Sequence, residues 1–257
     1  LLPESAFKLK IERDSELGAV EIDIGSLLGS FDKAVRQTYG KNPPEEVTNS
    51  LNEALQDLSR LDELGITGAV KESVVALRSY LDNMSVEYAE IIFEDAKKLA
   101  EQGNNEAAIA KAELLETIVG NLGQYVNRSY RAFDDPKWSE NVPDDVLNAA
   151  RSYLESRGST NVELVINELL KDGTAYDSME SMIKESMLGA KDLSILRQRK
   201  DIAPEIRALL GEYTDARVNF GRSATKMSRL LFNERFLRKI KEDGMGVYLF
   251  NLSLIHI

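Results

Sequence analysis

Apolar residues recur at spacings of three and four along most of the chain, which is typical of helices with one buried face. The clearest case follows Pro43 and Pro44, where two acidic residues begin a predicted helix with the stripe Val47, Leu51, Leu55, Leu58 and Leu61. The same spacing predicts helices over 70–81, 85–102, 107–119, 144–157, 160–170, 179–188 and 214–241. We therefore predict a mainly α fold of multi-helix antiparallel bundles with a long basic C-terminal helix and at most a minor β-hairpin.

Two stretches show a period of two instead. Residues 18–25 alternate Val20, Ile22 and Ile24 with acidic residues, and residues 246–250 are short, partly aromatic and begin with glycine. Both patterns are typical of strands, and the two strands could pair with each other. The predicted organisation is an N-terminal segment over 1–40 that includes the first strand, an acidic helical bundle over 41–125, and a second helical region over 126–251 that contains the long basic helix.

The composition narrows the class of protein. The chain has 257 residues, of which 43% are hydrophobic, and it has no cysteine. The lack of cysteine excludes disulfides, thiol nucleophiles and Cys-ligated metal centres in this sequence. No stretch reaches the roughly 18 consecutive apolar residues that a membrane-spanning helix needs, so we expect a soluble protein without membrane partners.

Charge is unevenly distributed along the chain. Residues 195–241 carry 12 Lys and Arg against 5 Asp and Glu, a net charge of +7, whereas residues 1–194 carry 20 against 36, a net charge of −16. One hypothesis is that the basic stretch contacts nucleic-acid phosphates. The alternative, which we favour, is that it pairs with the acidic bundle, because the overall charge of −11 repels a polyanion. The candidate nucleic-acid contacts are Arg197, Arg199, Lys200, Arg217, Arg222, Lys226, Arg229, Arg235, Arg238 and Lys239.

The sequence predicts no catalytic residue, no metal site and no cofactor. Its single histidine, His256, lies in the segment Leu-Ser-Leu-Ile-His-Ile at 252–257, which resembles a translated sequencing adapter and which we interpret as an artefact. The acidic pairs at 134–135 and 144–145 could serve acid–base or divalent-metal chemistry. Each pair also stands at a turn or a helix start, where aspartate is common for structural reasons, and we favour that interpretation.

The most distinctive stretch is Asn-Arg-Ser-Tyr-Arg-Ala-Phe-Asp-Asp-Pro-Lys-Trp at 127–138, which contains the only tryptophan. Its rings lie beside cationic residues and could form a platform for a ligand. The favoured interpretation is a loop anchored in the core by Tyr130, Phe133 and Trp138.

Three segments of the sequence, 74–85, 120–138 and 196–237, resemble an ordered set of segments in the very large polyvalent proteins of bacteriophages and related mobile elements. The resemblance implies a predominantly helical associated region of such a protein. Our leading hypothesis is that this region is non-enzymatic and serves in packing or docking between other domains of the same polypeptide. The resemblance also implies a virion or host-cytoplasm location. The alternatives are a DNA- or RNA-binding module flanking a phage polymerase or helicase, and part of an enzyme whose other catalytic residues lie elsewhere. Since the chain begins at Leu1 without methionine, we expect a metagenomic fragment of a longer reading frame.

Overall fold

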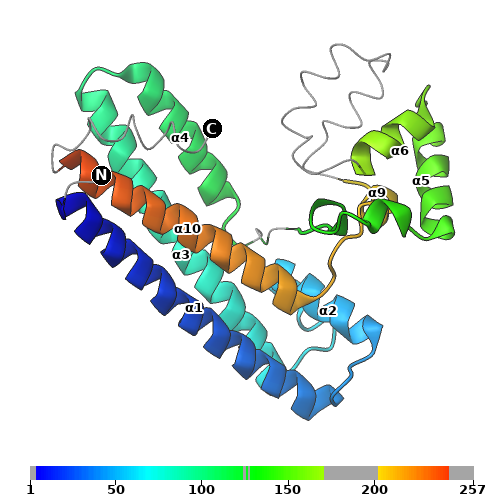
Figure 1. The fold of residues 1–257 in the computed structure, drawn as a ribbon. Helices are drawn as coiled ribbons and strands as arrows, with labels where there is room; N and C mark the ends of the chain where they lie inside the picture. Colours follow the sequence, from blue (N-terminus) through cyan, green and yellow to red (C-terminus); the bar gives the residue numbers. More distant parts are fainter. Residues whose placement is uncertain (1–3, 124–125, 127, 171–201, 243–257) are drawn as a thin grey trace. The chain divides into compact units, whose positions relative to one another are not determined.

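The part of the chain that the structure describes is mainly helical (Figure 1). The computed structural model describes residues 4–123, 126, 128–170 and 202–242. These ranges contain eight α-helices and no strand, so the predicted mainly α fold of packed helices is confirmed. The helices are α1 (Glu4–Tyr39), α2 (Glu45–Gln56), α3 (Gly68–Glu101), α4 (Asn105–Gly120), α5 (Asp144–Ser156), α6 (Val162–Leu170), α9 (Pro204–Leu209) and α10 (Ala216–Glu242).

Four of the sequence predictions lie outside the described residues. They are the helix over 179–188, the strand over 246–250, the adapter-like segment 252–257, and the cations Arg197, Arg199 and Lys200.

The chain divides into two compact units. Unit 1 comprises residues 1–127 and 214–257, and unit 2 comprises residues 128–213. The predicted domain boundaries therefore need a correction, because the long basic helix belongs with the N-terminal residues and not with residues 126–213. Its apolar face supplies the physical reason, since Phe220 and Ala224 are fully buried in the same core as residues of α1, α2 and α3.

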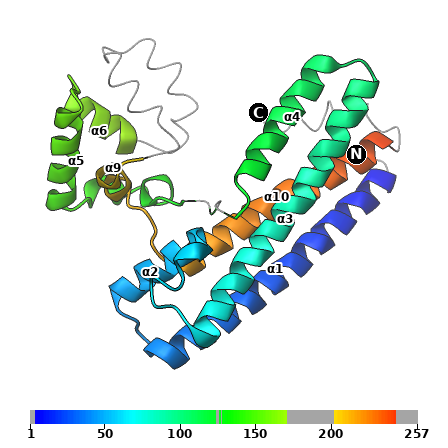
Figure 2. The same ribbon diagram turned by 180° about the vertical axis from the view of Figure 1, so that it is seen from behind.

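In unit 1, α1, α3 and α10 lie side by side (Figures 1 and 2). Helix α10 runs antiparallel to α1, because Arg217 near its start pairs with Asp32 while Lys239 near its end pairs with Glu12. It runs parallel to α3, whereas the sequence predicted antiparallel neighbours. The physical reason is the connection: α4 and unit 2 separate α3 from α10 in the chain, so these two helices are not joined by a short hairpin turn.

The core of unit 1 is mainly aliphatic, and it also contains buried polar side chains on α2, α3 and α10. The side chain of Asn219 donates to Asn52 at 2.8 Å, and both residues are buried. The guanidinium of Arg78 is 1% exposed, donates to the Leu55 carbonyl at 3.3 Å and to the Asp82 carboxylate at 3.0 Å, and thereby joins α2 to α3. A buried guanidinium is tolerated only when its charge and donors are satisfied in this way.

The predicted strand over 18–25 is wrong, because these residues lie inside α1. The helix conformation places Ile24 in the core at 7% exposure and leaves Ile22 at 74% exposure, whereas a half-buried strand would bury both. Positions that pack inward, among them Ile24, Phe31 and Val35, follow a helical spacing that continues to the end of α1. A second correction concerns α3, which continues without a break through residues 82–84, where the sequence predicted two helices.

Unit 2 has its own smaller core, formed by α5, α6, α9 and the segment that follows Val126. Leu154, Val165 and Leu209 are fully buried in it. An isolated antiparallel bridge joins Tyr130 to Glu212, and the backbone amides of Arg131 and Ala132 donate to the carbonyls of residues 211 and 210. These backbone bonds tie the first and last parts of unit 2 together.

Candidate nucleic-acid interface

The candidate interface is the basic helix α10. Asp215 immediately precedes its first residue and accepts a hydrogen bond from the backbone amide of Arg217 at 2.9 Å, which satisfies one of the free N–H groups at the helix start. Small and apolar residues on one side of α10 fill the space between α1 and α3. The cations occupy the remaining sides, so their environment depends on which neighbouring helix each one meets.

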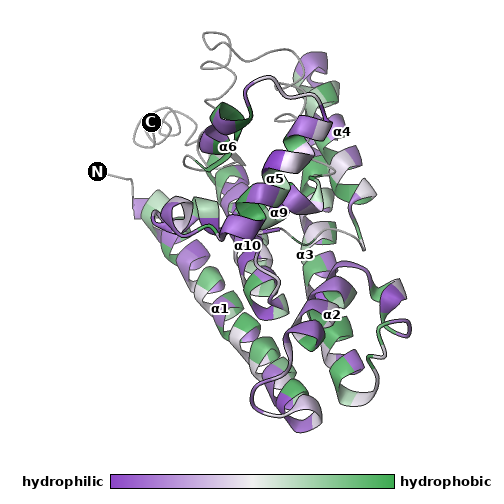
Figure 3. Ribbon diagram, turned by 90° about the vertical axis from the view of Figure 1, so that its right-hand side faces the viewer, coloured by the Kyte–Doolittle hydropathy of each residue, from purple (hydrophilic) through white to green (hydrophobic). Residues whose placement is uncertain are grey.

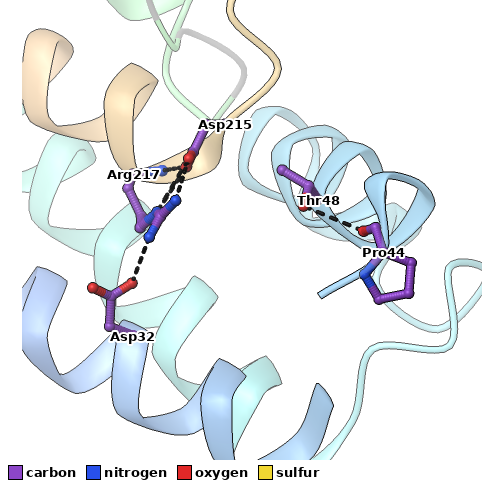
Figure 4. A network of polar contacts seen from close by, with 5 residues as sticks. All are labelled: Asp32, Pro44, Thr48, Asp215 and Arg217. Atoms are coloured by element: carbon purple, nitrogen blue, oxygen red, sulfur yellow. Dashed lines mark hydrogen bonds and ion pairs between the residues drawn. The ribbon is translucent and has the colours of Figure 1, made fainter. Parts of the chain in front are cut away.

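Arg217 lies between two carboxylates at the start of α10 (Figure 4). Its Nε donates to Asp215 at 3.0 Å, and its Nη1 lies 3.4 Å from Asp32 of α1. The hydrogen bond to Asp215 is the main cause of the raised pKa of Arg217. Burial alone raises the pKa of Asp215, but the hydrogen bonds from Arg217 outweigh burial and leave that pKa below its ordinary value. Both groups are therefore charged and paired at neutral pH.

Three cations near the other end of α10 also meet acidic residues of neighbouring helices. Arg235 lies 2.8 Å from Glu87 of α3, and Lys239 lies 2.5 Å from Glu12 of α1. Arg238 lies 3.1 Å from Asp95 of α3, with side-chain exposures of 26% and 19%. Surface ion pairs of this kind each contribute only about 0–1 kcal/mol, so their main effect is to set the position of α10 and to neutralise its charge.

The Asp95 carboxylate takes part in a small network. Lys111 of α4 lies 3.7 Å from Asp95 and 3.1 Å from Glu234 of α10, so one lysine joins three helices. Most of the network is partly buried, because the side chains of Lys111, Asp95 and Glu234 are 28%, 19% and 20% exposed. Removing its central carboxylate would leave cations in a poorly hydrated place.

The middle of α10 differs from its ends. Lys226 and Arg229 are exposed and have no ion-pair partner among the described residues, while Arg222 is partly buried and has a polar contact. Together with Leu230 and Asn233 they line an open hollow of about 430 Å³. Among the described residues, Lys226 and Arg229 therefore differ from the four α10 cations whose ion pairs are given above. Two cations without an ion-pair partner can neutralise only a few phosphates, so they would contribute little affinity for a nucleic acid.

The start of α10 also borders a cavity of about 400 Å³ in unit 1. Arg36 and Lys41 stand at this cavity, and Phe31, Val35 and Leu51 form apolar parts of its wall. The Thr48 hydroxyl, which also lines it, donates to the Pro44 carbonyl at 3.3 Å (Figure 4). The two carboxylates at this cavity, Asp32 and Asp215, both form ion pairs with Arg217. They therefore do not form a free pair of acidic groups for acid–base chemistry.

The acidic pairs singled out from the sequence lie at structural positions. Asp135 accepts from the backbone amide of Lys137 at 2.9 Å within a turn. Asp144 and Asp145 occupy the first turn of α5, where negative charge complements the helix dipole, and Pro143 holds the cap position itself. Across the described residues, no group of three acidic or histidine side chains comes together in a way that could hold a metal ion.

The aromatic residues of 127–138 lie in unit 2. Tyr130 is 6% exposed and meets Phe133 edge-on at 5.6 Å between ring centres, while Phe133 remains 39% exposed. The indole N–H of Trp138 donates to the Leu209 carbonyl at 2.9 Å, and Arg131 lies over the indole at 5.2 Å. Arg131 also lies 5.7 Å from the ring centre of Tyr213. Its cation–π contacts are therefore made with rings of its own unit.

Sequence reasoning missed the residues that pair with α10. The acidic balance of residues 1–194 indicated that such partners exist, but nothing in the spacing singles out Glu12, Asp32, Glu87 or Asp95. It also missed the buried Arg78. A signal for that residue was present, because Asp82 follows it by four positions on the same helix face.

Comparison with protein-family models, with curated proteins and with solved structures finds no match to this chain. None of the described helices combines the length and the apolar character that crossing a membrane requires.

Proposed function

We propose that this chain is a non-enzymatic helical packing and docking segment of a larger polyvalent phage or mobile-element protein, present in the virion or the host cytoplasm. The observation that carries the proposal is the pairing of α10 cations with carboxylates of neighbouring helices. Four of its seven predicted cations, Arg217, Arg235, Arg238 and Lys239, pair with carboxylates on α1 and α3. A basic helix whose charge is neutralised inside its own unit serves the packing of that unit. We call this function the strut role of α10.

The absence of a clustered chemical site among the described residues is consistent with this role but does not carry it. The acidic pairs serve turns and helix starts, and the rings of 130–138 contact residues of their own unit. The larger-protein context comes from the sequence resemblance alone.

A swap of charges between α10 and α3 tests the strut role. Arg235→Glu places a carboxylate against Glu87 and is expected to lower the thermal stability of the full chain, because like charges then face each other at a short distance. Combining it with Glu87→Arg restores the pair and is expected to recover most of the loss. Lys226→Glu, on the free part of the same helix, is the matched control and should leave the melting temperature nearly unchanged. Equal effects of Arg235→Glu and Lys226→Glu, with no recovery in the swap, contradict the strut role.

A second candidate function is nucleic-acid binding through the middle of α10. The observation in its favour is the pair of exposed cations Lys226 and Arg229, four and seven residues after Arg222 on one helix face. In that case Lys226→Glu with Arg229→Glu would abolish binding of DNA or RNA while leaving the stability of unit 1 unchanged.

A further inference from the structure

Helix α1 presents a second face that is largely exposed among the residues that the structure describes. Ten positions follow one another at spacings of three or four along that face, namely Glu4, Phe7, Ile11, Ser15, Gly18, Ile22, Gly25, Gly29, Lys33 and Arg36. We call this set the α1 seam. Nine of its members are exposed and Gly18 is half-buried, and hydrophobic positions recur along α1 in Figure 3.

Three large apolar side chains of the seam are exposed in the part of the chain that the structure describes. Phe7 and Ile11 are each 54% exposed, and Ile22 is 74% exposed. A single exposed apolar residue needs no explanation, but three on one stripe of one helix indicate a contact surface. The core-facing side of α1 is a separate stripe that includes Ile24, Phe31 and Val35.

The glycines of the seam are not explained by packing within the chain. A Cβ atom added to Gly18, Gly25 or Gly29 would meet no atom within 4 Å. None of the three has the positive φ that requires glycine, and glycine is a poor helix former. Glycines in such positions allow another backbone or a large side chain to approach closely.

The order of residues along the seam identifies what approaches. Pairing residue i with residue 40 − i maps the whole set onto itself: 4 with 36, 7 with 33, 11 with 29, 15 with 25, and 18 with 22. In this register both isoleucines face glycines, since Ile11 meets Gly29 and Ile22 meets Gly18. The acidic Glu4 faces the basic Arg36. Self-complementarity of this kind is the signature of a two-fold isologous interface.

We propose that two copies of this chain associate through their α1 seams as an antiparallel helix pair, with the two-fold axis at the level of residue 20. Each isoleucine then inserts into the space over a glycine of the partner, as knobs fit holes in coiled coils. The structure already contains such a space over Gly29, an open hollow of about 410 Å³ that is bordered by Lys33, Arg36 and Gln37.

Charge selects the antiparallel direction. The first half of the seam begins at the acidic Glu4, which also pairs with Lys8 of the same helix at 3.0 Å, and the second half ends at the basic residues Lys33 and Arg36. Lys33 and Arg36 have no ion-pair partner among the described residues. A parallel pair would place like charges opposite each other at both ends, whereas the antiparallel pair places opposite charges there. The proposed dimer does not depend on the strut role of α10, because the two proposals rest on different residues.

The mass of the full chain in solution, measured by analytical ultracentrifugation over a wide concentration range, tests the proposal. We expect a concentration-dependent dimer of twice the 28.7 kDa chain mass. Ile22→Lys, and separately Gly18→Leu, are expected to weaken dimerisation by about tenfold or more. A Cβ atom added to Gly18 meets no atom within 4 Å and leucine is a better helix former than glycine, so the melting temperature of Gly18→Leu should not fall under conditions where the wild type is monomeric. The matched control is Ile109→Lys on α4, where the isoleucine is 60% exposed, and it should dimerise like the wild type.

The register has its own test. Glu4→Arg should weaken the dimer, and adding Arg36→Glu should restore it, because the two positions meet only between copies. Within one chain they lie at opposite ends of a helix stretch about 48 Å long. A chain that stays monomeric at every concentration overturns the proposal, as does a dimer that Ile22→Lys and Gly18→Leu leave unchanged. A dimer that these variants weaken but that the charge swap does not restore overturns the antiparallel register.

Discussion

The guanidinium of Arg238 on α10 lies 3.1 Å from the carboxylate of Asp95 on α3. The two residues are far apart in the sequence, and the contact between them helps to assign the long basic helix to unit 1. Both side chains are less than a third exposed, so this pair is less screened by water than the ion pairs of Arg217, Arg235 and Lys239.

Replacing Asp95 tests the energetic weight of this network. Asp95→Asn removes the negative charge shared by Arg238 and Lys111 and is expected to lower the free energy of unfolding by about 1–2 kcal/mol. Chemical denaturation followed by circular dichroism measures the change. The control is Asp62→Asn, whose carboxylate pairs with Lys71 at 2.7 Å but is 82% exposed, and it should cost less than about 0.5 kcal/mol. Equal costs for the two variants would show that burial of the network contributes nothing.

Gly211 tests the core of unit 2. A Cβ atom at this position would lie 2.6 Å from the ring of Trp138, and the residue has φ of +69°. Gly211→Ala therefore combines a clash with backbone strain and is expected to destabilise unit 2 by about 2–4 kcal/mol. The fluorescence of Trp138, the only tryptophan, reports this unit directly.

Gly65→Ala separates strain from clash. Because Gly65 lies in unit 1 and Trp138 reports unit 2, the cost of Gly65→Ala is measured by circular dichroism. Gly65 has a similar φ of +68°, but a Cβ there would meet no atom within 4 Å. We expect a cost of only about 1 kcal/mol from the left-handed backbone conformation. If Gly211→Ala costs no more than Gly65→Ala, the close contact with Trp138 is not part of the packing of unit 2.

Acidification tests the start of α10. The pKa of Asp215 is lowered from its ordinary value of 3.8, because its hydrogen bonds with Arg217 outweigh burial. The stabilisation that Asp215 contributes is therefore fully present above its unfolded pKa and is lost as pH falls through the lower folded pKa. We expect Asp215→Asn to be less stable than the wild type at neutral pH, and the difference to shrink below about pH 4. Thermal melts of both proteins across this range give the measurement, and a difference that does not change with pH would contradict the assignment.

Substitutions of Arg78 test whether the buried charge at this position contributes to the free energy of unfolding. Arg78→Ala removes a fully buried side chain, leaves Asp82 without its ion-pair partner and frees the Leu55 carbonyl, so it is expected to cost about 3–5 kcal/mol. Arg78→Met keeps most of the volume and is expected to cost less. Denaturant titrations of both variants provide the comparison. Equal costs would mean that the charge, and not the filled volume, decides stability at this position.

The helix pattern of the sequence predicted the start of α2 and its stripe Val47, Leu51 and Leu55, but it extended the stripe to Leu58 and Leu61. The α-helix ends at Gln56, because the backbone of the next residue is extended and a separate 3-10 turn follows. The same reasoning failed for residues 18–25. There Ile24 faces the core and Ile22 faces solvent, so the apparent alternation combines residues from the two opposite faces of one helix. An exposed apolar face is the kind of feature that makes a helical period look like a strand period.

The candidate site was predictable only in its charge. The sequence showed that a basic stretch and an acidic region exist and that they could pair, and it located the cations of α10 by number. It could not show which carboxylates meet them, since Glu12 and Asp95 are no different in local pattern from the unpaired acids around them. Which cations remain free, such as Lys226 and Arg229, depends on the rotation of α10 between its neighbours, which is decided by packing in three dimensions.

The central claim is that the positive charge of α10 serves packing within unit 1. Its most direct test is a titration of fluorescently labelled duplex DNA and single-stranded RNA with the full chain at low salt, followed by anisotropy. The account predicts weak or undetectable binding, because the charge of α10 is largely neutralised by α1 and α3 and the whole chain carries a charge of −11. Tight binding that weakens steeply with salt and is lost in the Lys226→Glu, Arg229→Glu double variant would contradict it and establish the nucleic-acid role.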